Sequence, residues 1–160
     1  MPIFTMLIGI PGSGKSNWIK HNKMDGLLDN FIICPDEIRK TYFTDISNQD
    51  NNEKVWDIAK GMTIATLLLG KNVILDATNV NTKYRRDFLS YLPVCTKKAL
   101  LFTVDPQVAA SRVKDDIDHG LQRSNVPIEI IFRMYGEFLY TKTVIYDEGF
   151  DHIAFAFSYK

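Results

Sequence analysis

The chain has 160 residues, 46% of them hydrophobic and 24% charged, which suits one domain with a buried core and is too short for two comfortable ones. The 19 basic and 19 acidic residues cancel, which argues against a protein that coats nucleic acid, so a polynucleotide substrate would have to be held in a local cleft. No apolar stretch approaches the length needed to cross a membrane, and no signal peptide is visible.

The first predicted strand, Ile3–Ile8, runs directly into the sequence GIPGSGKS, and a helix is predicted to follow over Lys15–Met24. The sequence fits the pattern G-x-x-x-x-G-K-[ST] of a phosphate-binding loop (P-loop), in which backbone N–H groups surround phosphates at a helix N-terminus. Glycines allow the close backbone approach that such a loop needs. We therefore expect a nucleoside triphosphate to be bound by Gly9, Gly12, Ser13, Gly14, Lys15 and Ser16.

Two residues of this loop have expected side-chain roles. Lys15 would reach the β- and γ-phosphates as a catalytic residue, and the Ser16 hydroxyl would bind Mg²⁺. No guanine-selecting Asn-Lys-x-Asp motif is present, so ATP is the expected nucleotide. The alternative is a glycine turn with an unrelated lysine.

The second predicted strand, Phe31–Cys34, leads into a short helix over Asp36–Tyr42. Asp36 is the strongest candidate for a catalytic base, because an aspartate can both orient an acceptor hydroxyl and take its proton. Arg39 lies one helical turn later and could grip an anion of the acceptor through its planar donors. The alternative is that Asp36 caps the helix and Arg39 is an exposed helix residue.

A long helix is predicted over Asn52–Leu69, where apolar residues recur at three- and four-residue steps. Asp50 and Glu53 could form a capping box at its start, and Gly70 stands where a C-terminal cap is expected.

The third predicted strand, Asn72–Leu75, ends in Asp76, and a helix over Thr82–Tyr91 follows. A carboxylate at this position can hold a magnesium ion or its water shell. The alternative is a turn aspartate that bonds its own backbone.

The fourth predicted strand, Ala99–Val104, ends in Asp105, which we expect to cap a helix over Pro106–Asp116. The following polar segment, about 117–126, has the composition of a lid that closes over the nucleotide. Arg123 inside it is a candidate for an arginine that stabilises the leaving γ-phosphoryl group. Arg112 is a second candidate for nucleotide binding, and its alternative is a surface salt bridge with Asp115 or Asp116.

The last predicted helix spans Pro127–Tyr140, with proline at its first position, and the last strand spans His152–Phe157. Apolar strands that alternate with helices indicate an α/β fold with a parallel sheet covered on both faces. We therefore predict a P-loop NTPase fold with a five-stranded parallel sheet, flanking helices and a short lid, in a single domain over residues 1–160. Its ligands should lie at the carboxyl ends of the strands.

Both cysteines, Cys34 and Cys95, follow apolar residues, so we expect buried, reduced thiols that suit a reducing compartment. The cysteines and the missing signal peptide together predict a cytoplasmic protein.

Four segments together resemble the kinase domain of phage-type 5′-hydroxyl polynucleotide kinases, within the wider group of small P-loop kinases. They are GIPGSGKS, PDEIR at residues 35–39, VILDATN at residues 73–79 and RSNVP at residues 123–127. The similarity in motif order covers about Ile3 to Phe138. The resemblance also implies an intracellular protein, and a phage-encoded one is among the expected origins.

The resemblance implies an ATP- and magnesium-dependent kinase that transfers the γ-phosphoryl group to the 5′-hydroxyl of a DNA or RNA end. It assigns Asp36 as general base, Arg39 to the phosphate of the acceptor strand and Arg123 to the lid, with Thr78 and Asn79 among the substrate-binding residues. The phosphatase part common in such enzymes has no counterpart here, so we expect a separate phosphatase or ligase partner. A kinase for a nucleoside, sugar or antibiotic hydroxyl and a non-catalytic ATP-binding module are the alternatives.

Overall fold

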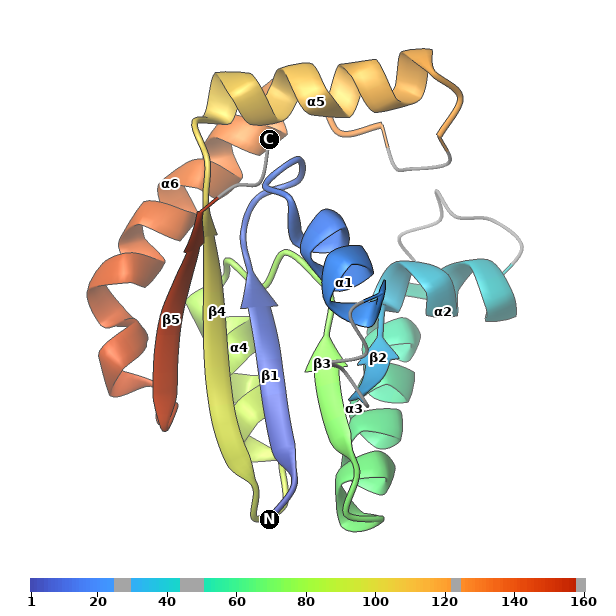
Figure 1. Ribbon diagram of the computed structural model, residues 1–160, viewed down its shortest axis with the longest axis vertical. Coiled ribbons are helices and arrows are strands. Elements are labelled where there is room, and N and C mark those ends of the chain that lie inside the picture. Colours follow the sequence, from blue (N-terminus) through green and yellow to red (C-terminus); the bar gives the residue numbers. More distant parts are fainter. Residues whose placement is uncertain (25–29, 44–50, 122–124, 158–160) are drawn as a thin grey trace.

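Within the described residues, five parallel strands form the centre of the molecule, which Figure 1 shows as a computed structural model. The structure describes residues 1–24, 30–43, 51–121 and 125–157. The strands are β1 (Ile3–Ile8), β2 (Asn30–Ile33), β3 (Asn72–Leu75), β4 (Thr96–Thr103) and β5 (His152–Phe157). The helices are α1 (Lys15–Met24), α2 (Pro35–Tyr42), α3 (Asn52–Leu68), α4 (Thr82–Ser90), α5 (Pro106–Asp118) and α6 (Ile128–Val144), with a 3₁₀ turn η2 (Ile145–Asp147).

The strand order is β2-β3-β1-β4-β5, and every pair is parallel. Strand β1 therefore lies in the middle, and the chain leaves it toward β2 on one side and later returns to β4 on the other. This change of direction opens a crevice at the carboxyl ends of the strands, where ligands bind in open α/β sheets. The predicted P-loop fold with a five-stranded parallel sheet is confirmed.

Strands β1 and β3 are mostly buried on both faces, as their apolar composition predicts, whereas His152, Ala154 and Phe155 of the edge strand β5 are exposed. On one face Leu7, Ile74 and Phe102 pack with Ile19 of α1. The other face packs mainly against α3, α4 and α6, whose buried residues join one large cluster with the alternate side chains of the strands. Helix α5 crosses above the carboxyl ends of the strands (Figure 1). Among the described residues, no helix combines the length and the apolar composition that crossing a membrane requires.

Strand β4 begins three residues before the predicted Ala99. Thr96 to Lys98 pair with Ile3 to Thr5 of β1. The ladder continues through these polar residues because they lie at the amino end of the sheet and are only partly buried. Hydropathy alone therefore placed the start of β4 too late.

The helix ends test three predicted caps. The Asp105 carboxylate accepts hydrogen bonds from the N–H groups of Gln107 and Val108, so the predicted N-cap of α5 is confirmed. Gly70 has a φ of 75° and, with Lys71, closes a Schellman motif after α3, as predicted. Asp50, half of the expected capping box, lies outside the described residues.

The start of α6 corrects one prediction. Pro127 is the N-cap of this helix and not its first residue. Its extended backbone, with φ of −56° and ψ of 147°, leaves the helical region at this position. The other end of α6 lies beyond the predicted Tyr140, since Thr141 is buried and Ile145 extends the core.

Candidate active site

The phosphate-binding loop connects β1 to α1 and contains two glycines with positive φ, Gly12 at 78° and Gly14 at 98°. A Cβ atom at Gly12 would lie 2.4 Å from the backbone oxygen of Ala109 in α5. Helix α5 therefore packs directly against the loop, at a distance that only glycine permits.

The Lys15 side chain lies back over its own loop. Its Nζ atom donates hydrogen bonds to the carbonyl oxygens of Gly9, at 2.8 Å, and Ile10, at 3.1 Å, and to Ser13 Oγ at 3.3 Å. Ser13 is completely buried, whereas Ser16, the second residue of α1, is exposed. The loop thus holds an ammonium group at its centre and presents a hydroxyl to solvent at the start of the helix.

Asp76 follows β3 at the same edge of the sheet. Burial raises the pKa of its carboxyl group above the ordinary value, the positive charge of Lys15 lowers it, and the negative charge of Asp36 raises it. The charges of Lys15 and Asp36 thus both act on the Asp76 carboxyl group. The two predicted residues therefore influence Asp76 at this edge of the sheet, and the catalytic and metal-binding roles of all three stay predictions.

The turn after Asp76 is tied to the phosphate-binding loop and to β1. The Gly9 N–H group donates to the Thr78 carbonyl oxygen at 2.9 Å, and Asn79 Nδ2 donates to the Leu7 carbonyl oxygen at 2.7 Å. Asn79 has a φ of 49°, a left-handed conformation that asparagine tolerates better than most residues. In this structure Asn79 shapes the turn, and contact of Thr78 and Asn79 with substrate stays a prediction.

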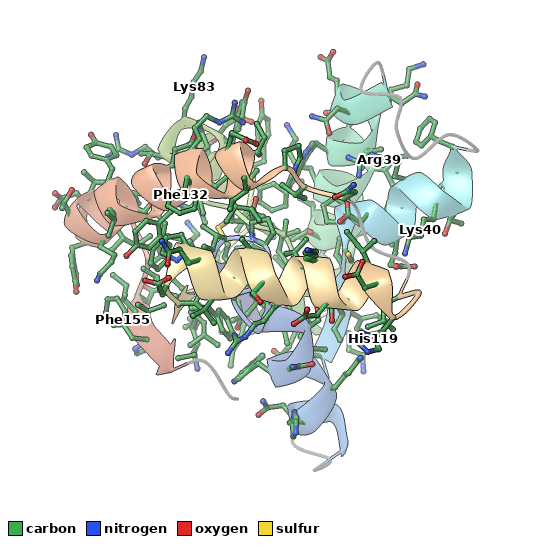
Figure 2. All side chains as sticks on the ribbon, turned by 90° about the horizontal axis from the view of Figure 1, so that it is seen from above. Arg39, Lys40, Lys83, His119, Phe132 and Phe155 are labelled. Carbon is green, nitrogen blue, oxygen red and sulfur yellow. The ribbon has the colours of Figure 1, made fainter. Side chains whose placement is uncertain are left out.

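Asp36 and Arg39 form an ion pair on α2, with 2.6 Å between Arg39 Nη1 and Asp36 Oδ1. The Asp36 side chain is 61% exposed, and the Arg39 side chain only 15%. Arg39 Nη2 also donates to Asn52 Oδ1 of α3 at 3.0 Å, and Figure 2 shows Arg39 on the side of α2 that faces α3. The alternative interpretation is wrong on both counts: Cys34 is the N-cap of α2, and Arg39 is mostly buried.

Arg112 of α5 reaches the phosphate-binding loop, because its Nη1 atom donates to the Gly12 carbonyl oxygen at 3.3 Å. This places a guanidinium beside the loop predicted to hold phosphates. Arg123, the other predicted arginine, lies outside the described residues, and so do Gln122 and Ser124 of the predicted lid. A cavity of about 500 Å³ lies between α5 and the start of α6, and Asn125 and Val126 are among the residues that line it.

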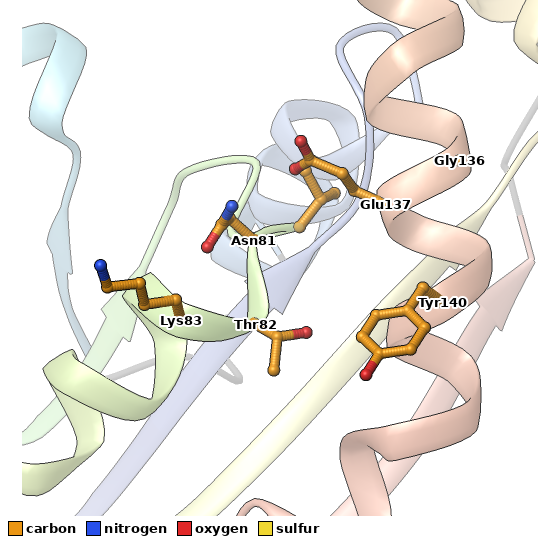
Figure 3. A pocket seen from close by; sticks show the side chains of 7 residues that line it. Asn81, Thr82, Lys83, Gly136, Glu137 and Tyr140 are labelled. Carbon is orange, nitrogen blue, oxygen red and sulfur yellow. The ribbon is translucent and has the colours of Figure 1, made fainter.

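A second cavity, of about 410 Å³, lies between the start of α4 and the middle of α6 (Figure 3). Lys83, Glu137 and Tyr140 line it together with the Asn81–Thr82 segment that follows the Asp76 turn. Its charged side chains have opposite signs, so the cavity does not select an anion by charge.

The residues present fit a magnesium ion that is carried by a nucleotide. Among the described residues, no group of three or more His, Cys, Asp or Glu side chains could hold a metal ion. Magnesium is commonly bound by one or two protein oxygens together with phosphates and water. Ser16, the residue after Lys15, and Asp76, which follows β3, supply oxygens of this kind.

Two contacts at this edge were not predicted from the sequence. Asn52 bonds Arg39 across a separation of 13 residues, and Arg85 bonds the Asn79 carbonyl oxygen at 2.8 Å from inside the core. The sequence predicted only that Arg85 lies in a helix, and nothing in it indicated that this arginine is buried.

Comparison with known proteins agrees with this geometry. Residues 4–138 match the model of a protein family that is described as an AAA domain. The chain belongs to this family. Membership places it among the small P-loop kinases and implies that it binds a nucleotide. No curated protein matches the chain.

Solved structures share the fold. A chain of the Pnkp1/Rnl/Hen1 RNA repair complex is 22% identical with a TM-score of 0.78, over 89% of this chain and 45% of that one. A second structure of the Pnkp1/Rnl/Hen1 complex gives 21% identity and a TM-score of 0.59, over 79% and 41%. The PezAT toxin–antitoxin system of Streptococcus pneumoniae gives 15% identity and a TM-score of 0.69, over 99% and 68%. The chain thus spans less than half of the two repair-complex chains.

Proposed function

We propose that the protein is an ATP-dependent kinase that transfers the γ-phosphoryl group to the 5′-hydroxyl of a DNA or RNA end. The observation that carries this proposal is the Asp36–Arg39 pair on α2, beside Asp76 and Lys15. A nucleotide-binding module without phosphotransfer would have no need of an exposed carboxylate held by a buried arginine at the acceptor side of the P-loop.

Asp36 would orient the acceptor hydroxyl toward the γ-phosphorus and accept its proton. Phosphoryl transfer has a loose transition state in most analyses, so positioning matters more than strong basicity. Arg39 has five N–H donors, enough to hold Asp36 and Asn52 and also to contact a phosphate of the acceptor strand.

The triphosphate would lie in the loop from Gly9 to Ser16, with Lys15 and Arg112 beside its phosphates and Arg123 above it. Ser16 and Asp76 would hold a magnesium ion, which supplies positive charge to the phosphate oxygens when bound. The Lys15 side chain would exchange its present bonds to the loop carbonyl oxygens for bonds to phosphate oxygens.

Two observations bear on the acceptor. The fold is shared with a chain of a complex described as acting in RNA repair, which supports a polynucleotide end. The balanced net charge favours the second candidate, a kinase for a small-molecule hydroxyl.

Substitution of Asp36 by Asn tests the proposal. We expect transfer of labelled phosphate from ATP to a 5′-hydroxyl oligonucleotide to fall by about 10²- to 10⁴-fold, the usual contribution of a general base, with ATP binding unchanged. Glu37→Gln is the matched control, because Glu37 is the next residue, is 67% exposed and pairs with Lys40. Unchanged transfer by Asp36→Asn would remove Asp36 from the mechanism.

A further inference from the structure

Arg85 of α4 is the largest completely buried side chain among the described residues, and it pairs with an equally buried carboxylate. Its Nε and Nη2 atoms donate to the two oxygens of Glu148, at 2.8 Å and 2.6 Å, in a bidentate arrangement. Glu148 follows η2, so this ion pair joins α4 to the end of the α6 segment, 63 residues away.

The remaining donors of Arg85 also have partners. Nη1 donates to the Asn79 carbonyl oxygen at 2.8 Å and to Thr141 Oγ1 at 2.9 Å, and Nη2 donates to Thr82 Oγ1 at 3.1 Å. All five N–H groups of the guanidinium are therefore used. The Thr141 hydroxyl lies 2.8 Å from the Val80 carbonyl oxygen, to which it can donate in turn.

These bonds hold the turn between Asp76 and Val80 from the side of the core. The opposite side of the same turn is held by the P-loop and β1, through the Gly9–Thr78 and Asn79–Leu7 hydrogen bonds. The turn is thus fixed between the phosphate-binding loop and a buried guanidinium.

Stability alone is a weak reason for such an arrangement. Removing two charges from water costs several kcal/mol, and replacement of a buried ion pair by apolar residues of similar volume is often neutral or stabilising. A guanidinium, however, can fix several acceptors in one plane at once, which an apolar pair cannot do.

We propose that Arg85 is a positioning residue that, with Glu148 and Thr141, sets the Asp76 turn against the phosphate-binding loop. The effect on catalysis rests on the function proposed above, because Asp76 is there assigned to the magnesium ion. The effect on the turn itself does not depend on that function.

The double variant Arg85→Met/Glu148→Leu tests the proposal, since it removes both charges and the bonds to the turn while filling the core. We expect a melting temperature within about 4 °C of the wild type, about 100-fold lower kcat and an unchanged affinity for ATP measured without magnesium. Amide hydrogen exchange should accelerate in residues 76–81. Arg86→Met is the matched control, because Arg86 is the next residue on α4 and is exposed; it should change none of these quantities.

A stable double variant with unchanged kcat and unchanged exchange in residues 76–81 would overturn the proposal and leave the pair a purely structural one. If the double variant does not fold, Thr141→Val decides by the same criteria, with an expected fall in kcat of about tenfold. If the wild type transfers phosphate to no acceptor, the proposed function fails, and the exchange measurement still decides whether Arg85 fixes the turn.

Discussion

At the scale of single residues, the candidate site places a carboxylate where burial disfavours its charge. Asp76 is mostly removed from water, and the nearby ammonium of Lys15 only partly offsets the effect of burial on its pKa. Such a group is poorly explained as a stabilising element of the nucleotide-free protein. It is well suited to a positive ligand that arrives with the nucleotide.

This environment predicts the pH dependence of stability in the absence of metal. Since burial raises the pKa of Asp76 in the folded state, the folded protein binds a proton more readily than the unfolded chain, and its stability falls as pH rises from the unfolded pKa through the folded one. The Asp76→Asn variant has no carboxyl group at this position, so its stability should not fall with pH for this reason. We expect the variant to be more stable than the wild type at pH 7 in EDTA, with a difference that disappears as pH falls to about 4.

Urea unfolding at several pH values measures this difference. Asp57→Asn, which changes a carboxylate on α3 that is 67% exposed, is the control and should show no comparable gain. A wild type and an Asp76→Asn variant with parallel pH profiles would contradict the assigned environment of Asp76.

At the scale of helices and strands, local sequence signals predicted where the elements lie in the chain, but they did not predict which strands pair with one another. Three features depend only on residues close together in the chain, and all appear where predicted: the glycine-rich loop, the Asp105 cap and Gly70. The order of the strands and the start of β4 depend on pairing between distant segments, which hydropathy along the chain does not encode.

Helix α3 offers a direct test of the local part of this account. Gly61 lies inside the helix and Gly70 just after it, and a Cβ atom at either would meet no neighbour within 4 Å. Only the backbone differs, because Gly70 has a φ of 75°. We expect Gly70→Ala to lower the free energy of unfolding by about 1–2 kcal/mol, and Gly61→Ala to raise it by about 0.5–1 kcal/mol.

Chemical denaturation of the two single variants beside the wild type gives both values. Equal effects of the two substitutions would contradict the assignment of Gly70 as a left-handed helix cap.

At the scale of the whole molecule, the candidate site is assembled from segments that are far apart in the chain and meet at one edge of the sheet. The sequence predicted Lys15, Asp36 and Asp76 there because each follows a strand whose carboxyl end lies at that edge. It did not distinguish Arg85 from Arg86, since the two look alike in sequence and only the fold buries the first against Glu148. The placement of Arg123 stays a prediction.

The balanced charge of the chain also belongs to this scale. With 19 basic and 19 acidic residues, attraction of a nucleic acid strand cannot come from the net charge and must come from local groups such as Arg39. A polynucleotide acceptor held by such contacts still releases counterions when it binds, so its affinity depends on salt.

The measurement that tests the central proposal most directly is transfer of labelled γ-phosphate from ATP to a panel of acceptors at low and high salt. The panel contains DNA and RNA oligonucleotides with a 5′-hydroxyl, the same strands with a 5′-phosphate, and single nucleosides. We predict label at the 5′ end of the 5′-hydroxyl strands alone, with a KM for the strand that rises with salt concentration. Label on the nucleosides, and none on any oligonucleotide, would contradict it.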